Sequence, residues 1–261
     1  MTITRILFLF ILLAIPLSAQ DAAVLEKANE LALQYTATLP NFICTETINR
    51  FMRRKPADPW KAQDKLTLSV AFSEKGEQYK LQAINDTPTT KAFQKVGGYK
   101  SRGEFGSLLR RIFQKESATR FKWERLETLN GNPVQVYSYR IDKDHSKYSV
   151  TMSSLLKTYQ DVFAMQGFIY IDQRSYQVMR FTAEAVGIPA DWPISATSSI
   201  VEYAFADIGG QQFLMPVTVE GNVVMKDKQT RNLIQFSDYR KFSSEATIDF
   251  ESSPLEDSRP D

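Results

Sequence analysis

The side chains that most often carry chemistry near neutral pH are scarce in this chain. His145 is its only histidine, and it lies in the polar stretch Asp142-Lys143-Asp144-His145-Ser146, directly after an alternating apolar segment. Asp144 and His145 could ligate a metal, or His145 could activate Ser146 as a nucleophile. Neighbouring residues of an extended segment point to opposite faces, however, whereas a catalytic triad needs its groups to converge. We therefore interpret this stretch as a solvated loop.

No other pattern typical of an active site accompanies His145. The only cysteine is Cys44, so the further histidine or cysteine ligands of a zinc site are missing from the sequence. The chain also has no phosphate-binding loop, dinucleotide fingerprint, nucleophile elbow or zinc-protease motif. Its many carboxylates leave a carboxylate-based hydrolase open as a third hypothesis, although the sequence shows no pairing. We predict a protein that is not an enzyme, with no catalytic residue, no metal and no cofactor.

The charge balance argues against nucleic acid as a partner. The formal net charge is +2 at pH 7 and falls nearer zero without the segment that carries Arg5, whereas a nucleic-acid-binding domain has a strong basic excess. The lone Cys44 excludes an intramolecular disulfide, and it follows Phe42 and Ile43 in an apolar run. We predict that its thiol is buried and inert, with pairing between two chains as the alternative.

Residues 1–20 have the pattern of a secretory signal peptide. Arg5 supplies a positive start, residues 6–15 form an apolar core that ends at Pro16, and small residues follow before Asp21. The apolar core is too short for a stable membrane span, although an uncleaved N-terminal anchor is the rival interpretation. No cysteine stands at the expected cleavage site, so a lipid-anchored form is not predicted. The mature protein is predicted to be periplasmic or secreted.

The elements that would position any functional residue are mainly β-strands. Residues 167–250 are an almost unbroken series of alternating apolar and polar residues, separated by turn signals such as Gly209-Gly210. This pattern is typical of an antiparallel meander with one buried face and one wet face. Pro216 lacks a backbone donor and is expected at an edge or a bulge. We predict one domain over residues 21–251 and a disordered tail over residues 252–261.

Earlier segments predict further strands. A strand over residues 65–73 is followed by a turn and a return strand, and a long loop is expected over residues 85–102. Residues 119–141 predict a hairpin around Asn130-Gly131, the strongest short hairpin signal. Residues 152–165 fit either a pair of strands or a short helix.

Two helices are predicted, over residues 21–39 and 104–116, because apolar residues recur there at helical spacing. The second helix has a dense apolar face made of Leu108, Leu109, Ile112 and Phe113. A helix of this kind usually covers the apolar face of an open sheet. Its cationic polar side leaves a position at a membrane surface as the alternative. The predicted fold class is therefore mainly β (α+β): a curved antiparallel sheet or half-barrel, with one or two helices covering its concave face.

Arg50, Arg53 and Arg54 form a basic cluster with Phe51 and Met52 inside it. Such a cluster could contact anionic lipid head groups at a membrane surface, by charge attraction and apolar insertion. The other interpretation is the end of a strand that continues into a solvated loop.

The terminal meander resembles a known superfamily. The segments GFIYID, YQVMRF and VEYAFADIGGQQFLMPVTVEG, within residues 167–250, are similar to the outer-membrane lipoprotein carrier and sorting superfamily. The resemblance implies a curved half-barrel whose helices fill its concave face, and a cavity that accepts acyl chains. The carriers are typically smaller than this chain, so the resemblance transfers only an apolar concave lining and no specific residue. The final YRKF and ATIDF segments also resemble secreted bacterial proteins of unknown function, which we expect to be the nearer match.

Two main hypotheses follow for the function. In the first, the protein binds a hydrophobic ligand (a lipid, an acyl chain or a lipidated protein) in an apolar trough, which predicts a pocket that its own side chains do not fill. In the second, it is a structural or interaction protein of the envelope with a filled core, and with an exposed apolar surface or an unpaired strand. The predicted lining of the trough is Leu108, Leu109, Ile112, Phe113, Met179, Phe181, Tyr203, Phe213 and Met215.

Overall fold

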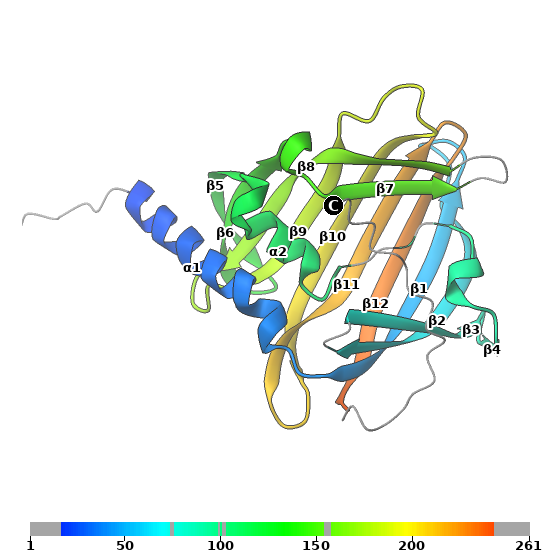
Figure 1. Cartoon of the computed structure of the whole chain (residues 1–261), viewed down its shortest axis with the longest axis horizontal. Coiled ribbons are helices and arrows are strands. Elements are labelled where there is room, and N and C mark those ends of the chain that lie inside the picture. Colours follow the sequence, from blue (N-terminus) through cyan, green and yellow to red (C-terminus); the bar gives the residue numbers. More distant parts are fainter. Residues whose placement is uncertain (1–16, 74–75, 99, 101–102, 154–157, 243–261) are drawn as a thin grey trace, which may run out of the picture.

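Alternating apolar and polar residues build one curved antiparallel sheet with two α-helices on its concave side (Figure 1). The computed structural model describes residues 17–73, 76–98, 100, 103–153 and 158–242. The strands are β1 (Phe42–Arg53), β2 (Lys61–Ser73), β3 (Gly76–Ile84), β4 (Thr87–Pro88), β5 (Arg120–Leu129), β6 (Asn132–Ile141), β7 (Tyr148–Ser153), β8 (Thr158–Asp172), β9 (Val178–Val186), β10 (Ile194–Asp207), β11 (Gln212–Met225) and β12 (Gln229–Lys241). The helices are α1 (Leu17–Thr38) and α2 (Ser107–Phe113), with short 3-10 turns η1 (Phe93–Lys95), η2 (Lys115–Ser117) and η3 (Lys143–His145).

The strand order is β4-β3-β2-β1-β12-β11-β10-β9-β8-β6-β5, and β7 pairs with β8 off this path. The first and last long strands meet in the middle of the sheet, where Ile48 of β1 is paired with Ile234 of β12. Within the described residues no pairing joins β4 to β5, so the sheet is open. The predicted mainly β fold class, with a curved antiparallel sheet and helices on its concave face, is confirmed.

Several local predictions from the sequence are also confirmed. Asn130 and Gly131 both have positive φ, 50° and 82°, as a tight turn between β5 and β6 requires. Pro216 is paired with Tyr203 at a register shift between β10 and β11, which is the expected bulge. Residues 148–153 and 158–172 are strands, so the described residues of the segment 152–165, which fitted either strands or a helix, belong to a strand pair. The end of the predicted meander, up to residue 250, and the predicted tail over residues 252–261 lie outside the described residues.

The β7–β8 pair bends away from the main sheet. The first part of β8 pairs with β7, and its second part pairs with β6 and β9. Trp192, in the β9–β10 loop, lies edge-on to Phe163 of β8 with ring centroids 4.8 Å apart. Figure 1 shows β7 running across the direction of β10, β11 and β12.

One glycine permits a close strand approach inside the sheet. Tyr139 of β6 is paired with Gly167 of β8, and its hydroxyl donates to the carbonyl oxygen of Thr182 in β9 at 2.8 Å. The ring therefore crosses over Gly167 to reach the second strand along. A Cβ atom at Gly167 would lie 2.0 Å from the Thr182 carbonyl oxygen.

Candidate functional site

The concave face of the sheet is the candidate ligand-binding face, and both helices lie against it. Helix α1 buries one stripe of side chains at i, i+4, i+8 and i+11, and α2 buries every apolar residue that it has. The buried residues of the helices are Val24, Ala28, Ala32 and Tyr35 from α1, and Leu108, Leu109, Ile112 and Phe113 from α2. They pack into one hydrophobic core with the inward side chains of the sheet.

The structure gathers most of the predicted lining residues in this core. The four α2 residues are buried, as are Phe181, Tyr203 and Met215 of the sheet. Ile112, Phe181 and Met215 have no exposed surface. These side chains therefore fill the space between α2 and the sheet themselves.

The other two predicted lining residues, Met179 and Phe213, are only half-buried. Met179 lies at a register shift between β8 and β9, where Tyr170 pairs with Arg180 and Ile171 pairs with Val178. Met179 is thus an extra residue in β9, and it contacts a small second hydrophobic cluster as well as the main core. The second cluster consists of Leu129, Val134, Val136 and Tyr170.

Buried tyrosine hydroxyls attach the covering layer to the sheet. Tyr35 of α1 donates to the carbonyl oxygen of Leu214 in β11 at 2.7 Å, and Tyr203 of β10 donates to the carbonyl oxygen of Glu104 at 2.7 Å. The two tyrosine rings meet edge to face, 6.0 Å apart. Burial raises the pKa of both hydroxyls well above the ordinary value, so both stay neutral donors.

The two helices approach each other closely at Gly106. This residue precedes α2 with φ 108°, and a Cβ atom there would lie 2.4 Å from the Tyr35 ring. Glycine is the residue that accepts both this backbone conformation and this contact. The packing of α2 on the sheet is therefore coupled to the position of α1.

Arg50 holds the loop before α2 over the concave face. Its guanidinium donates to both carboxylate oxygens of Asp64, at 2.5 and 2.6 Å, and also to the carbonyl oxygen of Gly97. The side chains of Arg50 and Asp64 are only 17% and 22% exposed. The hydrogen bond from Arg50 is the largest cause that holds the pKa of Asp64 below its ordinary range. Of the predicted basic cluster, Arg53 donates to Gln229 at 2.7 Å, and Arg54 is exposed.

Carboxylates are also present in the interior. Glu46 and Glu104 are buried, and Tyr79 donates to the carboxylate of Glu77 at 2.6 Å. Burial, together with the nearby Glu77, Glu104 and Glu46, raises the pKa of the Tyr79 hydroxyl well above its ordinary value. The thiol of Cys44 is buried in the same region. Burial, followed by the charges of Glu46 and Glu77, raises its pKa, so the thiolate needed for reactivity is disfavoured.

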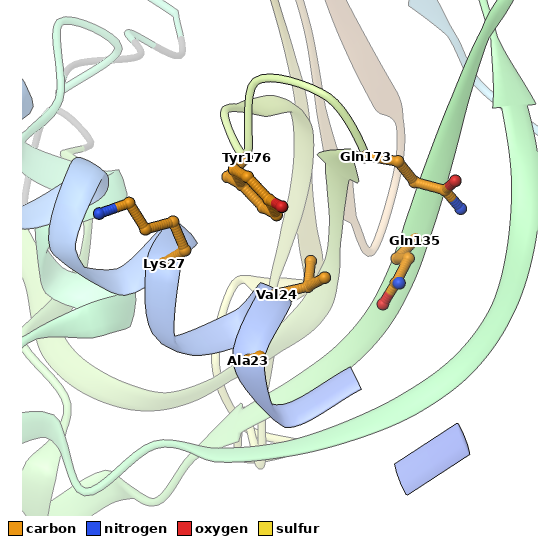
Figure 2. A pocket seen from close by; sticks show the side chains of 6 residues that line it. All are labelled: Ala23, Val24, Lys27, Gln135, Gln173 and Tyr176. Atoms are coloured by element: carbon orange, nitrogen blue, oxygen red, sulfur yellow. The ribbon is translucent and has the colours of Figure 1, made fainter. Parts of the chain in front are cut away.

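Open space remains at one end of the concave face, beneath the first turns of α1. A pocket of about 330 Å³ lies between α1, β6 and the β8–β9 turn, and is lined by Ala23, Val24, Lys27, Gln135, Gln173 and Tyr176. Figure 2 shows Val24 on the helix side and Gln135 and Gln173 across the gap from it. The side-chain oxygen Oε1 of Gln135 accepts a hydrogen bond from the Tyr137 hydroxyl at 2.5 Å, and the side-chain nitrogen of Gln135 is a hydrogen-bond donor. The Lys27 amine pairs with Glu30 at 2.7 Å.

The sequence did not single out these pocket residues, although it carried one signal. Gln135 precedes Tyr137, Tyr139 and Ile141 in the alternation of β6, so it occupies an inward position in an apolar series. The structure buries it with only 4% exposed. A polar side chain at such a position indicates a polar partner inside the fold.

His145 does not form a reactive group with its neighbours. It is exposed in η3, and its Nδ1 lies 3.2 Å from the carbonyl oxygen of Glu116. The hydroxyl of Ser146 accepts the backbone N–H of Tyr148 at 3.1 Å. In the part of the chain that the structure describes, no three His, Cys, Asp or Glu side chains gather as a metal site would require.

No helix among the described residues has both the length and the apolar character needed to cross a bilayer. No family model matches the chain, and no curated protein sequence matches it.

Solved structures provide the only matches. A LolA superfamily protein from Nitrosomonas europaea is 13% identical, with 84% of this chain and 93% of that chain covered and a TM-score of 0.37. A putative outer-membrane lipoprotein-sorting protein domain from Vibrio parahaemolyticus is 11% identical over 84% and 94%, with a TM-score of 0.37. A DUF1329 family protein from Desulfovibrio piger is 9% identical over 84% and 93%, with a TM-score of 0.36. The first two of these structures bear the name of the superfamily, or of the sorting proteins, that residues 167–250 resemble.

Proposed function

We propose that the protein binds an amphiphile, a molecule with an apolar chain and a hydrogen-bonding head, at the α1 end of the concave face. The observation that carries this proposal is the pocket beneath α1. Its volume of about 330 Å³ is at the lower end of ligand sites, which span roughly 300–1,000 Å³. Val24 gives it an apolar wall, and Gln135, Gln173 and Tyr176 give it polar groups.

The cover of this pocket is easier to displace than the rest of the core. Two of the four buried residues of α1, Ala28 and Ala32, are alanines, which fill little volume against the sheet. A longer apolar chain would extend from the pocket along this stripe and replace the contacts of α1. The head would hydrogen-bond to the amides of Gln135 and Gln173. With residues 1–20 as a signal peptide, the ligand would be a component of the envelope or the exterior, and the role would be non-catalytic.

Native mass spectrometry with lipid extraction tests this proposal on protein purified without detergent. Wild-type protein is expected to carry a near-stoichiometric amphiphile. The variant Val24→Trp places a large ring in the pocket and is expected to lose it. Leu33→Trp is the matched control, because Leu33 is an exposed residue of the same helix, and it should retain the ligand. A wild-type protein that stays empty after incubation with envelope lipids contradicts the proposal.

The filled core favours a second candidate, a structural or interaction protein of the envelope. Seven of the nine predicted lining residues are buried by other side chains of the same chain. This is the arrangement of a core that needs no ligand. If the wild-type protein is folded and stable but carries no amphiphile, this second function is the better assignment.

A further inference from the structure

A cationic surface forms at one end of the sheet from two segments that are far apart in the sequence. The β1–β2 turn (residues 54–60) and the β11–β12 turn (residues 226–228) lie side by side, because β1 pairs with β12 and Arg53 is opposite Gln229. Figure 1 shows both connections at the same end of the sheet. We call this surface the basic end.

The basic end carries far more positive than negative charge. With the strand residues that flank the two turns, its cations are Arg53, Arg54, Lys55, Lys61, Lys226, Lys228 and Arg231, and its acidic residues are Asp58, Asp227 and Glu220, which pairs with Arg231. Arg54, Lys55, Lys61 and Lys226 are exposed. None of these four forms a salt bridge with another described residue. The carboxylate of Asp58 accepts the backbone N–H of Lys55, which shapes the turn.

An aromatic residue fixes this surface. The guanidinium carbons of Arg53 and Arg231 each lie 4.4 Å from the centre of a Trp60 ring. Arg53 also donates to the carbonyl oxygen of Pro56 at 2.7 Å, and Arg231 pairs with Glu220 at 3.2 Å. Through Trp60, these contacts tie the β1–β2 turn to the ends of β1 and β12, next to which Arg54 and the exposed lysines lie.

We propose that the basic end docks the protein on the surface of an anionic lipid bilayer. Clustered Lys and Arg side chains are attracted to anionic head groups, and each contributes separately near the surface. The whole chain has a net charge of only +2. The attraction to anionic head groups therefore comes from the cations of the basic end and not from the charge of the whole molecule. It also differs from the cluster that the sequence indicated. Arg50 is engaged with Asp64, and the exposed charge comes largely from Lys55, Lys61 and Lys226.

Vesicle sedimentation tests the proposal with the purified mature protein, from which the predicted signal peptide, residues 1–20, has been removed. Vesicles of equal parts phosphatidylglycerol and phosphatidylcholine are expected to bind the protein, and vesicles of phosphatidylcholine alone are not. Binding should weaken steeply with salt, because the Debye length falls from about 10 Å at 0.1 M to about 3 Å at 1 M. The readout is independent of the pocket, so Val24→Trp should leave it unchanged even if the proposed function is wrong.

The decisive variant is the double change Lys55→Glu and Lys226→Glu, with one exposed residue from each turn. It is expected to weaken vesicle binding by at least about tenfold, since each cation removed from a surface contact costs several-fold in affinity. The control is Arg174→Glu and Arg240→Glu, which changes net charge equally at exposed positions of the opposite end and should bind as wild type. Equal loss in both variants, or wild-type binding by the decisive variant, overturns the proposal. Equally tight binding of a duplex oligonucleotide at the same salt overturns it in favour of a general polyanion surface.

Discussion

At Gly167 the backbone of β8 lies against β9 with no room for a side chain. A Cβ atom would meet the carbonyl oxygen of Thr182 at 2.0 Å and its carbonyl carbon at 2.7 Å. Gly167→Ala is therefore expected to lower the free energy of unfolding by about 2–4 kcal/mol, because neither backbone can yield without breaking sheet pairing. Urea unfolding followed by circular dichroism measures this change.

Gly97→Ala is the matched control. No atom lies within 4 Å of the position that its Cβ would take, and its φ is not in the left-handed region. Gly97→Ala should change the free energy of unfolding by no more than about 1 kcal/mol. The change can be stabilising, because alanine lowers the conformational entropy of the unfolded chain. Equal stability of the two variants would show that β8 and β9 are farther apart in solution.

The ion pair of Arg50 and Asp64 predicts a pH dependence at the residue scale. The pKa of Asp64 is lower in the folded state than in the unfolded chain. The ion pair therefore stabilises the fold fully at pH values above the pKa of Asp64 in the unfolded chain, which is about 4. This stabilisation is lost as the pH falls through the lower pKa that Asp64 has in the folded state. Asp64→Asn should lower the free energy of unfolding at pH 7 by about 1–2 kcal/mol. This cost lies between that of breaking an exposed ion pair and that of breaking a buried one.

Unfolding measured from pH 7 to pH 3 tests this prediction. The difference in unfolding free energy between wild type and Asp64→Asn should be constant at neutral pH and shrink in acid. Asp86→Asn is the control, because Asp86 pairs with Lys65 but is 73% exposed, and it should cost no more than about 0.5 kcal/mol. A difference that persists unchanged at pH 3 would assign the effect of Asp64→Asn to packing.

At the scale of elements, α2 is expected to behave as part of the core. Ile112 has no exposed surface, so Ile112→Ala should cost about 2–5 kcal/mol for lost contacts and the cavity that remains. Ser107→Ala, at an exposed position of the same helix, should change stability by about 0.5 kcal/mol or less. Thermal or urea unfolding measures both variants. A cost below about 1 kcal/mol for Ile112→Ala would show that α2 is a loosely held cover.

Local patterns were enough to predict most elements, because alternation, helical spacing and turn chemistry act over a few residues. The two helices, the Asn130-Gly131 hairpin and the bulge at Pro216 are examples. Met179 shows where the pattern fails. A register shift between β8 and β9 interrupts the alternation there, and a pattern of period two cannot reveal one inserted residue.

Sites made by distant pairing could not be predicted in the same way. Lys226 lies beside the β1–β2 turn only because the last strand pairs with the first. Gln135 forms a pocket with α1, more than 100 residues earlier in the chain. Such contacts depend on the register of the whole sheet. The buried face was therefore predictable in outline, whereas the pocket and the basic end emerge only from the assembled fold.

At the scale of the whole molecule, an open sheet leaves two edges that must resist association. The β5 edge is a ten-residue strand with exposed cations at Arg120, Lys122 and Arg125, and a register shift between Trp123 and Arg125. Charges and bulges of this kind discourage edge-to-edge pairing. We expect Lys122→Val together with Arg125→Val to convert β5 into a flatter, apolar edge. Concentration-dependent dimers or larger species should then appear in sedimentation velocity experiments, while wild type keeps its own distribution.

The control for this edge prediction adds the same β-branched side chains away from the edges. Thr218→Val and Gln235→Val change two exposed residues that face each other across β11 and β12, in the middle of the sheet. The backbone groups of these strands are already paired, so the added apolar surface offers no strand edge to a second copy. This control should sediment as wild type. If both double variants associate equally, apolar surface alone drives the association, and the charges of β5 do not protect an edge.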